Sequence, residues 1–481
     1  MNTFTRVVVI AAVAFFGGVL AQSDAPAFFV NEQPVTEAEL ARARRADSLA
    51  SRNFKGALGF ESELLVLNQL VVIRVAAQDA AIVPLTSEEV DLQIKQIRDQ
   101  NNLIDDAQYE AAIQGAGYSI ESFRKDQEAN LRIQKRISEL QASGKASEAE
   151  LKFLYELSPQ TYAESGKQPA AFATLTPEQR DRLEFDAKKL KQDEAIEAWV
   201  AELTSNAQVR FPEGSSLEWF NPVVASVDGF EIRLDVFLRE VYSNPEVGRF
   251  IEQAEAHTTE AFLSIFKARA LERLIDTAVA AQYASRSDQP FFGMYQNQFE
   301  QIQQFITQNI QISEVEARAY YLKNKSSYST QASAELVVAA FSNSVDAKKF
   351  RQQLLKSQGE NMFKLAAQNH GAASELGRLD ADKLIANQTD LLKPEKLTRV
   401  KQGHVSKVIN GNGQVNVYLV TDFQPASVQP FEAVRQQVSD KARMQAQEKA
   451  ASIFWAAERK NHEIINNLGQ VQAELEARAK R

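Results

Sequence analysis

The stretches LVVIRVAAQDAA (residues 70–81) and LIDTAVAAQYAS (residues 274–285) share the tetrapeptide VAAQ inside an apolar run of helix-like composition. The two copies lie 204 residues apart in a chain of 481 residues. A chain of this length is long enough for two or three domains. The repeated tetrapeptide suggests that one helical module occurs twice. Other segments that repeat in the same order along the chain would support this duplication.

Three further pairs of segments repeat in that order. They are FFVNEQPVTEAEL (28–40) with ASVDGFEIRLDVF (225–237), SEAELKFLYELSPQTY (147–162) with SEVEARAYYLKNKSSY (313–328), and AIEAWVAEL (195–203) with ASIFWAAER (451–459). The first pair reads as strand, turn and helix start, and Thr36 with Glu39 forms a capping-box pattern. Helices rich in Ala and Glu can match by composition alone, but four matches in one order favour a duplication.

The spacing between the copies locates an insertion. The offset falls from 204 to 166 before the tyrosine-containing segment, so the first copy is 38 residues longer there. It then rises to 256, so the second copy is 90 residues longer after that segment. About 90 residues is the size of a small domain. We therefore expect a mainly α fold of two helical modules, with the second interrupted by a small α+β domain.

The insert has the pattern of such an α+β domain. QASAELVVAAF (331–341) is a strand candidate, and VKQGHVSKVINGNGQVNVYLVTDF (400–423) reads as two strands around an Asn-Gly hairpin signal. The predicted organisation is an export signal at 1–21, a first helical module at 22–215, a second at 216–328, the insert at 329–424, and a C-terminal helix at 425–481 that completes the second module.

The N-terminus has the pattern of a secretory signal. Arg6 precedes an apolar and glycine run from Val7 to Leu20, and a cut is expected near Ala21/Gln22. The rival interpretation is a retained anchor, but a spanning helix needs roughly 20 residues. We expect an exported protein of the periplasm or cell envelope that is soluble after cleavage. The chain has no cysteine, so it forms no disulfide.

Composition and motifs exclude several classes of function. A net charge of −9 without a basic run argues against nucleic-acid binding. The chain has neither a phosphate-binding glycine loop nor a dinucleotide fingerprint, so we expect no nucleotide and no cofactor. Four widely spaced histidines and no cysteine predict no metal site. Polypeptides remain as the expected partners.

One helix is a candidate for contacting such a polypeptide. In QNQFEQIQQFITQNIQ (296–311), apolar side chains recur at helical spacing on one face. These side chains are Phe299, Ile302, Phe305, Ile306 and Ile310. The commoner interpretation is a face that packs on its own neighbours, and the alternative is a face that lines a groove for a client chain.

The mature chain resembles the family of exported folding factors that includes SurA, PrsA and PpiD. Residues 30–40 are similar to the opening of their helical chaperone module, V-N-G-x-x-I-x-x-x-E-L, and residues 105–137 to its central helices. GENMFKLAAQNH, SELGRL and VKQGHVSKV in the insert are similar to the parvulin frame. The resemblance implies an ATP-independent chaperone for unfolded exported or outer-envelope proteins, with a parvulin-type prolyl isomerase domain.

The insert departs from the family at its catalytic positions. Glu335 stands where the resemblance implies a first histidine, and Asn416 and Val417 stand where it implies a second. His370 and His404 do not fall at either position. Isomerisation needs an apolar pocket and a polar network rather than a strong nucleophile. We therefore expect little or no isomerase activity and identify no catalytic residue in the chain.

Two alternatives to a passive chaperone stay open from the sequence. One is an active parvulin-type peptidyl-prolyl cis-trans isomerase, against which the missing histidines count. The other is a structural cell-envelope component built on the same fold and bound to one fixed partner. The oligomeric state is also open, and a homodimer is one alternative.

Overall fold

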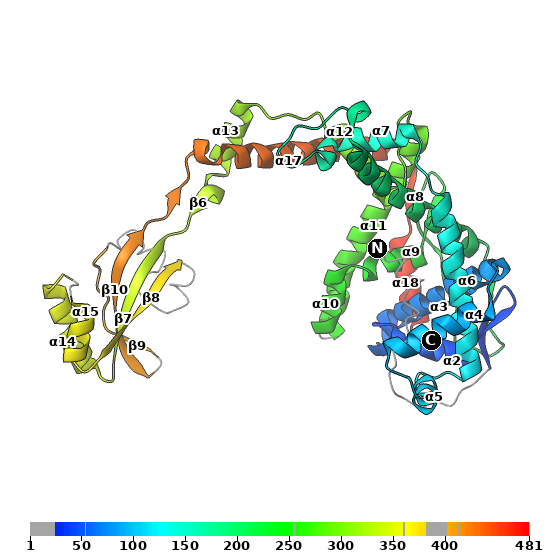
Figure 1. The fold of residues 1–481 in the computed structure, drawn as a ribbon, viewed down its shortest axis with the longest axis horizontal. Coiled ribbons are helices and arrows are strands. Elements are labelled where there is room, and N and C mark those ends of the chain that lie inside the picture. Colours follow the sequence, from blue (N-terminus) through cyan, green and yellow to red (C-terminus); the bar gives the residue numbers. More distant parts are fainter. Residues whose placement is uncertain are drawn as a thin grey trace. The chain divides into compact units, whose positions relative to one another are not determined.

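The computed structural model describes residues 25–52, 54–253, 256–358, 361–380, 402–411 and 413–480 (Figure 1). The predicted export signal and its cut near Ala21/Gln22 lie outside these residues. The chain divides into two compact units. Unit 1 comprises Met1–Asn309 and Ala450–Arg481, and unit 2 comprises Ile310–Lys449. Unit 1 thus holds most of both predicted helical modules, and unit 2 holds the insert with the helical segments that flank it.

The first copy opens with a β-hairpin that leads into a capped helix. Strand β1 (Pro26–Val30) pairs antiparallel with β2 (Gln33–Thr36), and α2 (Glu37–Ala46) follows directly. Asn31 and Glu32 both adopt positive φ, as a two-residue hairpin turn requires. Thr36 and Glu39 form the predicted capping box, in which each side chain accepts from the other's backbone N–H.

The rest of the first copy is helical until a short closing strand. Its elements are α3 (Gly56–Asp79), α4 (Ser87–Gln100), α5 (Asp106–Gly115), α6 (Ile120–Ser143), α7 (Glu148–Leu157), α8 (Pro177–Ser205) and β3 (Val209–Arg210). Helices α3, α6 and α8 bury a shared apolar core that includes Val72, Ile133 and Trp199. Strand β3 pairs with β1, which gives the sheet order β2-β1-β3.

The second copy repeats this arrangement. Its elements are β4 (Val223–Val227), β5 (Phe230–Arg233), α9 (Leu234–Tyr242), α10 (Pro245–Gln253), α11 (Ala256–Arg286), α12 (Tyr295–Thr307), α13 (Glu314–Lys323), α17 (Phe431–Glu458), β12 (Ile464–Asn466) and α18 (Leu468–Arg478). Asp228 and Gly229 make the positive-φ turn of its hairpin. Strand β12 closes the sheet in the order β12-β4-β5, again beside the first strand of the hairpin.

The tyrosine-containing segments show where the insert enters. The rings of Tyr155 and Tyr162 lie 5.9 Å apart at 38°, and those of Tyr321 and Tyr328 lie 5.5 Å apart at 40°. The Tyr155 hydroxyl donates to the carbonyl of Ala170, and the Tyr321 hydroxyl donates to that of Gln429 at 2.6 Å. Each acceptor lies shortly before the closing helix of its copy. The insert therefore occupies the place of a short loop in the first copy, which supports the duplication.

Helix α3 is the core helix of unit 1. Among the residues that the structure describes, the helical segment Gly56–Ile82, which contains α3, is long enough and apolar enough to cross a membrane. In this fold it packs against α2, α6 and α8 of the first copy and against α9 and α18 of the second. Its apolar composition is therefore explained by contacts on several sides, and it joins the two copies in one unit.

Unit 2 contains a four-stranded antiparallel sheet in the order β8-β7-β10-β9 (Figure 1). Its elements are β7 (Ser333–Phe341), α14 (Ser344–Lys356), α15 (Met362–Gln368), β8 (Ala372–Asp380), β9 (Ile409–Gly411) and β10 (Gln414–Gln424). A two-stranded neck of β6 (Ser329–Thr330) and β11 (Ser427–Val428) connects this sheet to α13 and α17. The strands expected on both sides of the Asn-Gly signal are present, and Asn412 itself lies outside the described residues. The predicted fold class is confirmed.

Candidate functional site

The central strands of unit 2 present two different faces. Alternate residues of β7, from Val337 to Phe341, pack with Val417 and Leu419 of β10 against α14 and α15. The opposite face, called here the second sheet face, has its own apolar cluster. It consists of buried Ala334, Leu336, Tyr418 and Val420 and partly buried Val338, Leu379, Ile409 and Phe423. The four buried members are at most 9% exposed.

Glu335 lies in an ion-pair cluster that spans three strands. Arg378 on β8 donates to the Glu335 carboxylate at 3.3 Å, to the Ser333 hydroxyl at 3.2 Å, and to the Asp422 carboxylate. The hydrogen bond from Arg378 lowers the pKa of Asp422, and Asp422 in turn raises the pKa of Arg378. Glu335 therefore acts as an acceptor for Arg378. Because β7 alternates, its side chain leaves the strand away from the second sheet face.

The structure does not bring Glu335 together with Asn416 and Val417. In the β7–β10 ladder Asn416 lies opposite Ala340, whereas Glu335 lies opposite Asp422. Five residues along β7 separate the two pairs, which corresponds to roughly 17 Å. Asn416 shares a face with Ala340, and Val417 is fully buried in the core on the other side. The assignment of these residues to the family's histidine positions stays a prediction, and they do not form one site.

The two histidines of the insert lie at its turns. His370 is exposed at the end of α15, with a left-handed φ of 58°. The backbone carbonyl of His404 accepts from the Val420 N–H at 2.9 Å, which places its loop beside β10. Partial burial, followed by the charge of Arg351, lowers the pKa of His404. Neither histidine belongs to the residues of the second sheet face.

Ser406, the last residue of the segment GHVS (403–406), forms hydrogen bonds with the backbone of Tyr418 on β10. Its side chain is fully buried, and its N–H donates to the Tyr418 carbonyl at 2.9 Å. The Ser406 hydroxyl oxygen accepts from the Tyr418 N–H, also at 2.9 Å. Arg351 donates to the Ser406 carbonyl at 2.6 Å. These bonds fix the backbone of Tyr418, so the segment positions the second sheet face and does not itself offer a nucleophile.

Placing a histidine at the first family position is expected not to create an isomerase. In Glu335→His the imidazole would lie beside Arg378 and on the face opposite Asn416, so it would reach neither that residue nor the second sheet face. The turnover of a proline tetrapeptide should stay at the level of the unchanged protein. The control is Asn416→His, which places the imidazole on the second sheet face. A gain of tenfold or more in Glu335→His alone would contradict this geometry.

The candidate client-binding helix packs into the core of unit 1. Ile302 is completely buried, and the ring of Phe299 stacks on Trp455 at a centroid distance of 4.8 Å. Phe305 lies 6.0 Å from the ring of Phe153, and Ile306 borders the same core as Phe299. Helix α12 ends at Thr307, before the expected end, so half-buried Ile310 is not on it. The chain's own side chains thus cover this face, as the packing interpretation expected.

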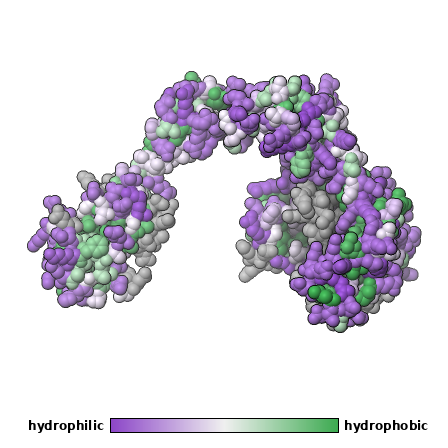
Figure 2. Space-filling view, viewed as in Figure 1, coloured by the Kyte–Doolittle hydropathy of each residue, from purple (hydrophilic) through white to green (hydrophobic). Residues whose placement is uncertain are grey.

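Sequence periodicity missed the apolar side chains that are exposed on unit 1. Ile82 after α3, Ile104 before α5 and Phe185 on α8 are 82%, 78% and 68% exposed. On the face shown in Figure 2, hydrophobic areas interrupt a largely hydrophilic surface. Among the residues that the structure describes, no three or more His, Cys, Asp or Glu side chains are grouped so that they could hold a metal ion.

Comparison with known proteins locates the domain of unit 2. Residues 312–436 match the model of the PPIC-type PPIase domain. No curated protein matches the chain. Solved structures from a study of PEB4 and Cj1289, described as structurally related SurA-like chaperones of Campylobacter jejuni, share similarity with it. One has 16% identity, covers 50% of this chain and 98% of its own, and has a TM-score of 0.26. Another has 12% identity, covers 51% and 99%, and has a TM-score of 0.20.

The match spans α13, the neck, the four-stranded sheet and the start of α17. It includes the segments that the sequence assigned to the parvulin frame. The chain therefore carries a PPIC-type, parvulin-like PPIase domain at residues 312–436, and its resemblance to the SurA- and PrsA-type folding factors is confirmed in that domain.

Proposed function

We propose that the protein is an exported, ATP-independent chaperone that binds unfolded secreted or outer-envelope polypeptides, and that its parvulin-like domain has little or no isomerase activity. The observation that carries the proposal is a PPIC-type domain whose central strands β7 and β10 contain no histidine. Glu335, which the family resemblance assigns to one of the histidine positions, accepts a hydrogen bond from Arg378. These strands lack the histidines that the family resemblance implies, which supports little or no turnover.

The helical part supports passive binding of clients. Exposed apolar side chains such as Ile82, Ile104 and Phe185 are distributed over separate elements of unit 1. Several small apolar contacts of this kind favour weak and adaptable association with many sequences. The chain has no nucleotide-binding motif, so release would follow from weak affinity rather than from ATP hydrolysis.

The test measures two activities on one sample of residues 22–481. We expect no acceleration of isomerisation of a proline tetrapeptide above background. Without ATP, we expect suppressed aggregation of a denatured β-barrel protein at near-stoichiometric amounts of this chain. A clear isomerase rate would favour the active-isomerase alternative. Failure of both activities, together with a stable stoichiometric complex on purification, would favour a structural envelope component.

A matched control removes the insert without disturbing the helices. Thr330 and Ser427 are paired neighbours in the neck, so residues 331–426 can be replaced by an Asn-Gly turn. The first copy already folds with a short loop at this place. The shortened chain should suppress aggregation nearly as well as the full chain if unit 1 binds most clients. A complete loss of suppression would assign client binding to the parvulin-like domain.

A further inference from the structure

The two units differ in the sign of their net charge. Unit 2 (Ile310–Lys449) contains 19 Lys and Arg against 14 Asp and Glu, so its net charge is +5. The whole chain contains 54 Lys and Arg against 63 Asp and Glu, so unit 1 has 35 against 49 and a net charge of −14. Such an imbalance within one chain favours an anionic partner for the basic part.

Helices α14 and α15 concentrate positive charge in unit 2. Their basic residues are Lys348, Lys349, Arg351 and Lys356 on α14 and Lys364 on α15. Their one acidic residue, Asp346, lies in the first turn of α14 and accepts from the Asn343 side-chain amide at 2.8 Å. Arg351 donates to the Ser406 carbonyl. The four lysines are exposed, and in the part of the chain that the structure describes none of them forms an ion pair.

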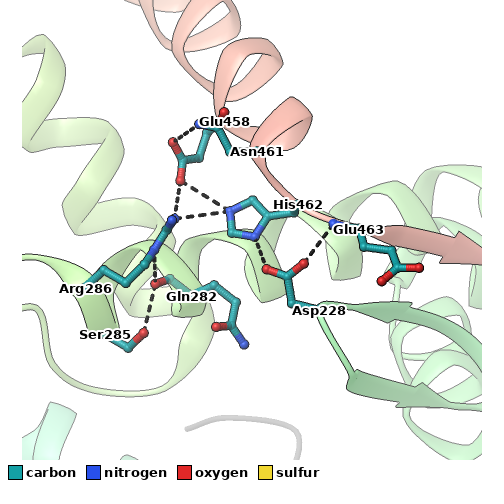
Figure 3. A network of polar contacts seen from close by, with 8 residues as sticks. All are labelled: Asp228, Gln282, Ser285, Arg286, Glu458, Asn461, His462 and Glu463. Atoms are coloured by element: carbon teal, nitrogen blue, oxygen red, sulfur yellow. Dashed lines mark hydrogen bonds and ion pairs between the residues drawn. The ribbon is translucent and has the colours of Figure 1, made fainter.

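A charged cluster with a structural role in this protein looks different. Around the buried ring of His462, Arg286 pairs with Glu458 (Figure 3). The Asp228 carboxylate lies 2.6 Å from Nδ1 of the same ring and accepts from the Glu463 N–H at 2.8 Å. The charges there are satisfied by other parts of the fold. The lysines of α14 and α15 have no such ion pairs, so a structural role does not account for them.

The same side of the two helices exposes apolar side chains. Helix α14 buries Ala347, Phe350 and Leu354 towards the sheet, so its opposite side faces solvent. The exposed apolar residues are Val345 (72%) and Leu355 (46%) on α14 and Phe363 (51%) on α15. The two helices pack against each other on one side of the sheet (Figure 1). Their four lysines and these three apolar residues are called here the α14–α15 face.

The composition and shape of this face favour a membrane over an acidic polypeptide. The backbone groups of a helix bond within the helix except at its ends, so the face offers an extended chain no backbone partners. Peptides are commonly bound by a groove or by a sheet edge, and this face is the outer side of two helices. A bilayer needs neither, because headgroup phosphates attract lysines and apolar side chains enter the headgroup region.

We propose that the α14–α15 face binds the surface of an anionic lipid bilayer. The lysines pair with headgroup phosphates, and Val345, Leu355 and Phe363 enter the interface. At 0.1 M salt only charges within about 10 Å of the headgroups act strongly on them. The net charge of −9 therefore does not prevent binding through a basic face. This membrane contact is separate from client binding and from isomerase activity, and its test depends on neither.

The experiment measures co-sedimentation of residues 22–481 with lipid vesicles. Vesicles of phosphatidylcholine with about 30% phosphatidylglycerol present an anionic surface, and vesicles of phosphatidylcholine alone do not. We expect binding to the first kind only. This binding should weaken as the ionic strength rises from about 0.05 M to about 0.5 M. Equal binding to both kinds of vesicle, or binding to neither, would overturn the proposal.

Matched variants assign the binding to the face. Lys349→Gln/Lys356→Gln should weaken the affinity for anionic vesicles about 25-fold, because each lysine near such a surface contributes about fivefold. Lys323→Gln/Lys325→Gln removes the same charge from exposed positions at the end of α13 and just after it, and should change the affinity by less than about twofold. Equal losses in the two double variants would overturn the assignment.

An acidic polypeptide is distinguished with labelled polyglutamate, whose binding is followed by fluorescence anisotropy. We expect polyglutamate to bind more weakly than the anionic vesicles. Phe363→Ser should weaken binding to the vesicles and leave binding to polyglutamate unchanged, because only a bilayer takes up the ring. Polyglutamate binding that is lost in Lys349→Gln/Lys356→Gln, without any binding of vesicles, would assign the face to an acidic polypeptide and overturn the proposal.

Discussion

Replacement of Glu61 by leucine is expected to destabilise unit 1 by about 3–5 kcal/mol. The Glu61 side chain is 2% exposed, and it accepts from Lys267 at 2.5 Å and from the Tyr242 hydroxyl. Burial, with Glu61 next in importance, raises the pKa of Tyr242 well above its ordinary value. Removing the carboxylate would leave the Lys267 ammonium, which is 13% exposed, without its counter-charge.

The measurement is denaturant unfolding followed by tryptophan fluorescence. Trp199, Trp219 and Trp455 all belong to unit 1, so their emission reports that unit. The double variant Glu61→Leu/Lys267→Met removes both charges, and its free energy of unfolding should return to within about 1–2 kcal/mol of the unchanged chain. Glu240→Gln, which removes one partner of the more exposed pair with Arg273, should cost at most about 1 kcal/mol. A Glu61→Leu cost below that of Glu240→Gln would show that the buried pair does not stabilise unit 1.

This buried cluster also shows what the sequence could not predict. Glu61 belongs to α3 of the first copy, whereas Tyr242 and Lys267 belong to α9 and α11 of the second. Capping boxes and hairpin turns are local patterns, and those at Thr36 and Asp228 were readable from neighbouring residues. A contact between residues more than 180 positions apart has no such local signal. The sequence therefore predicts the repeated elements but not their packing into one unit.

In the parvulin-like domain, the sequence predicts the positions of the strands but not how they pair. Strand positions were readable from alternation, and the segments of β7 and β10 were expected. The register between them was not, because Thr421 is an extra residue in β10 between the Leu336–Val420 and Glu335–Asp422 pairs. A family motif describes the residues along one strand and does not indicate which residue of the neighbouring strand pairs with each of them. For this reason the separation of Glu335 from Asn416 emerged only from the structure.

Substitution of Gly371 by alanine is expected to destabilise unit 2 by about 1–3 kcal/mol while leaving unit 1 unchanged. A Cβ at this position would overlap the ring of Phe341, with the Cζ atom at 2.8 Å. That ring cannot move aside freely, because it is 2% exposed and lies 5.0 Å from the ring of Phe350. The cost is therefore overpacking of the core between the sheet and its two helices.

The two units can be followed separately in this variant. Circular dichroism should show that part of the helix and strand signal unfolds at a lower denaturant concentration, whereas the tryptophan transition should not move, because unit 2 contains no tryptophan. The control is Gly469→Ala in α18, where an added Cβ meets no atom within 4 Å. An unchanged dichroism transition in Gly371→Ala would mean that the core accommodates the methyl group. Aggregation suppression that persists once unit 2 has unfolded would place client binding in unit 1.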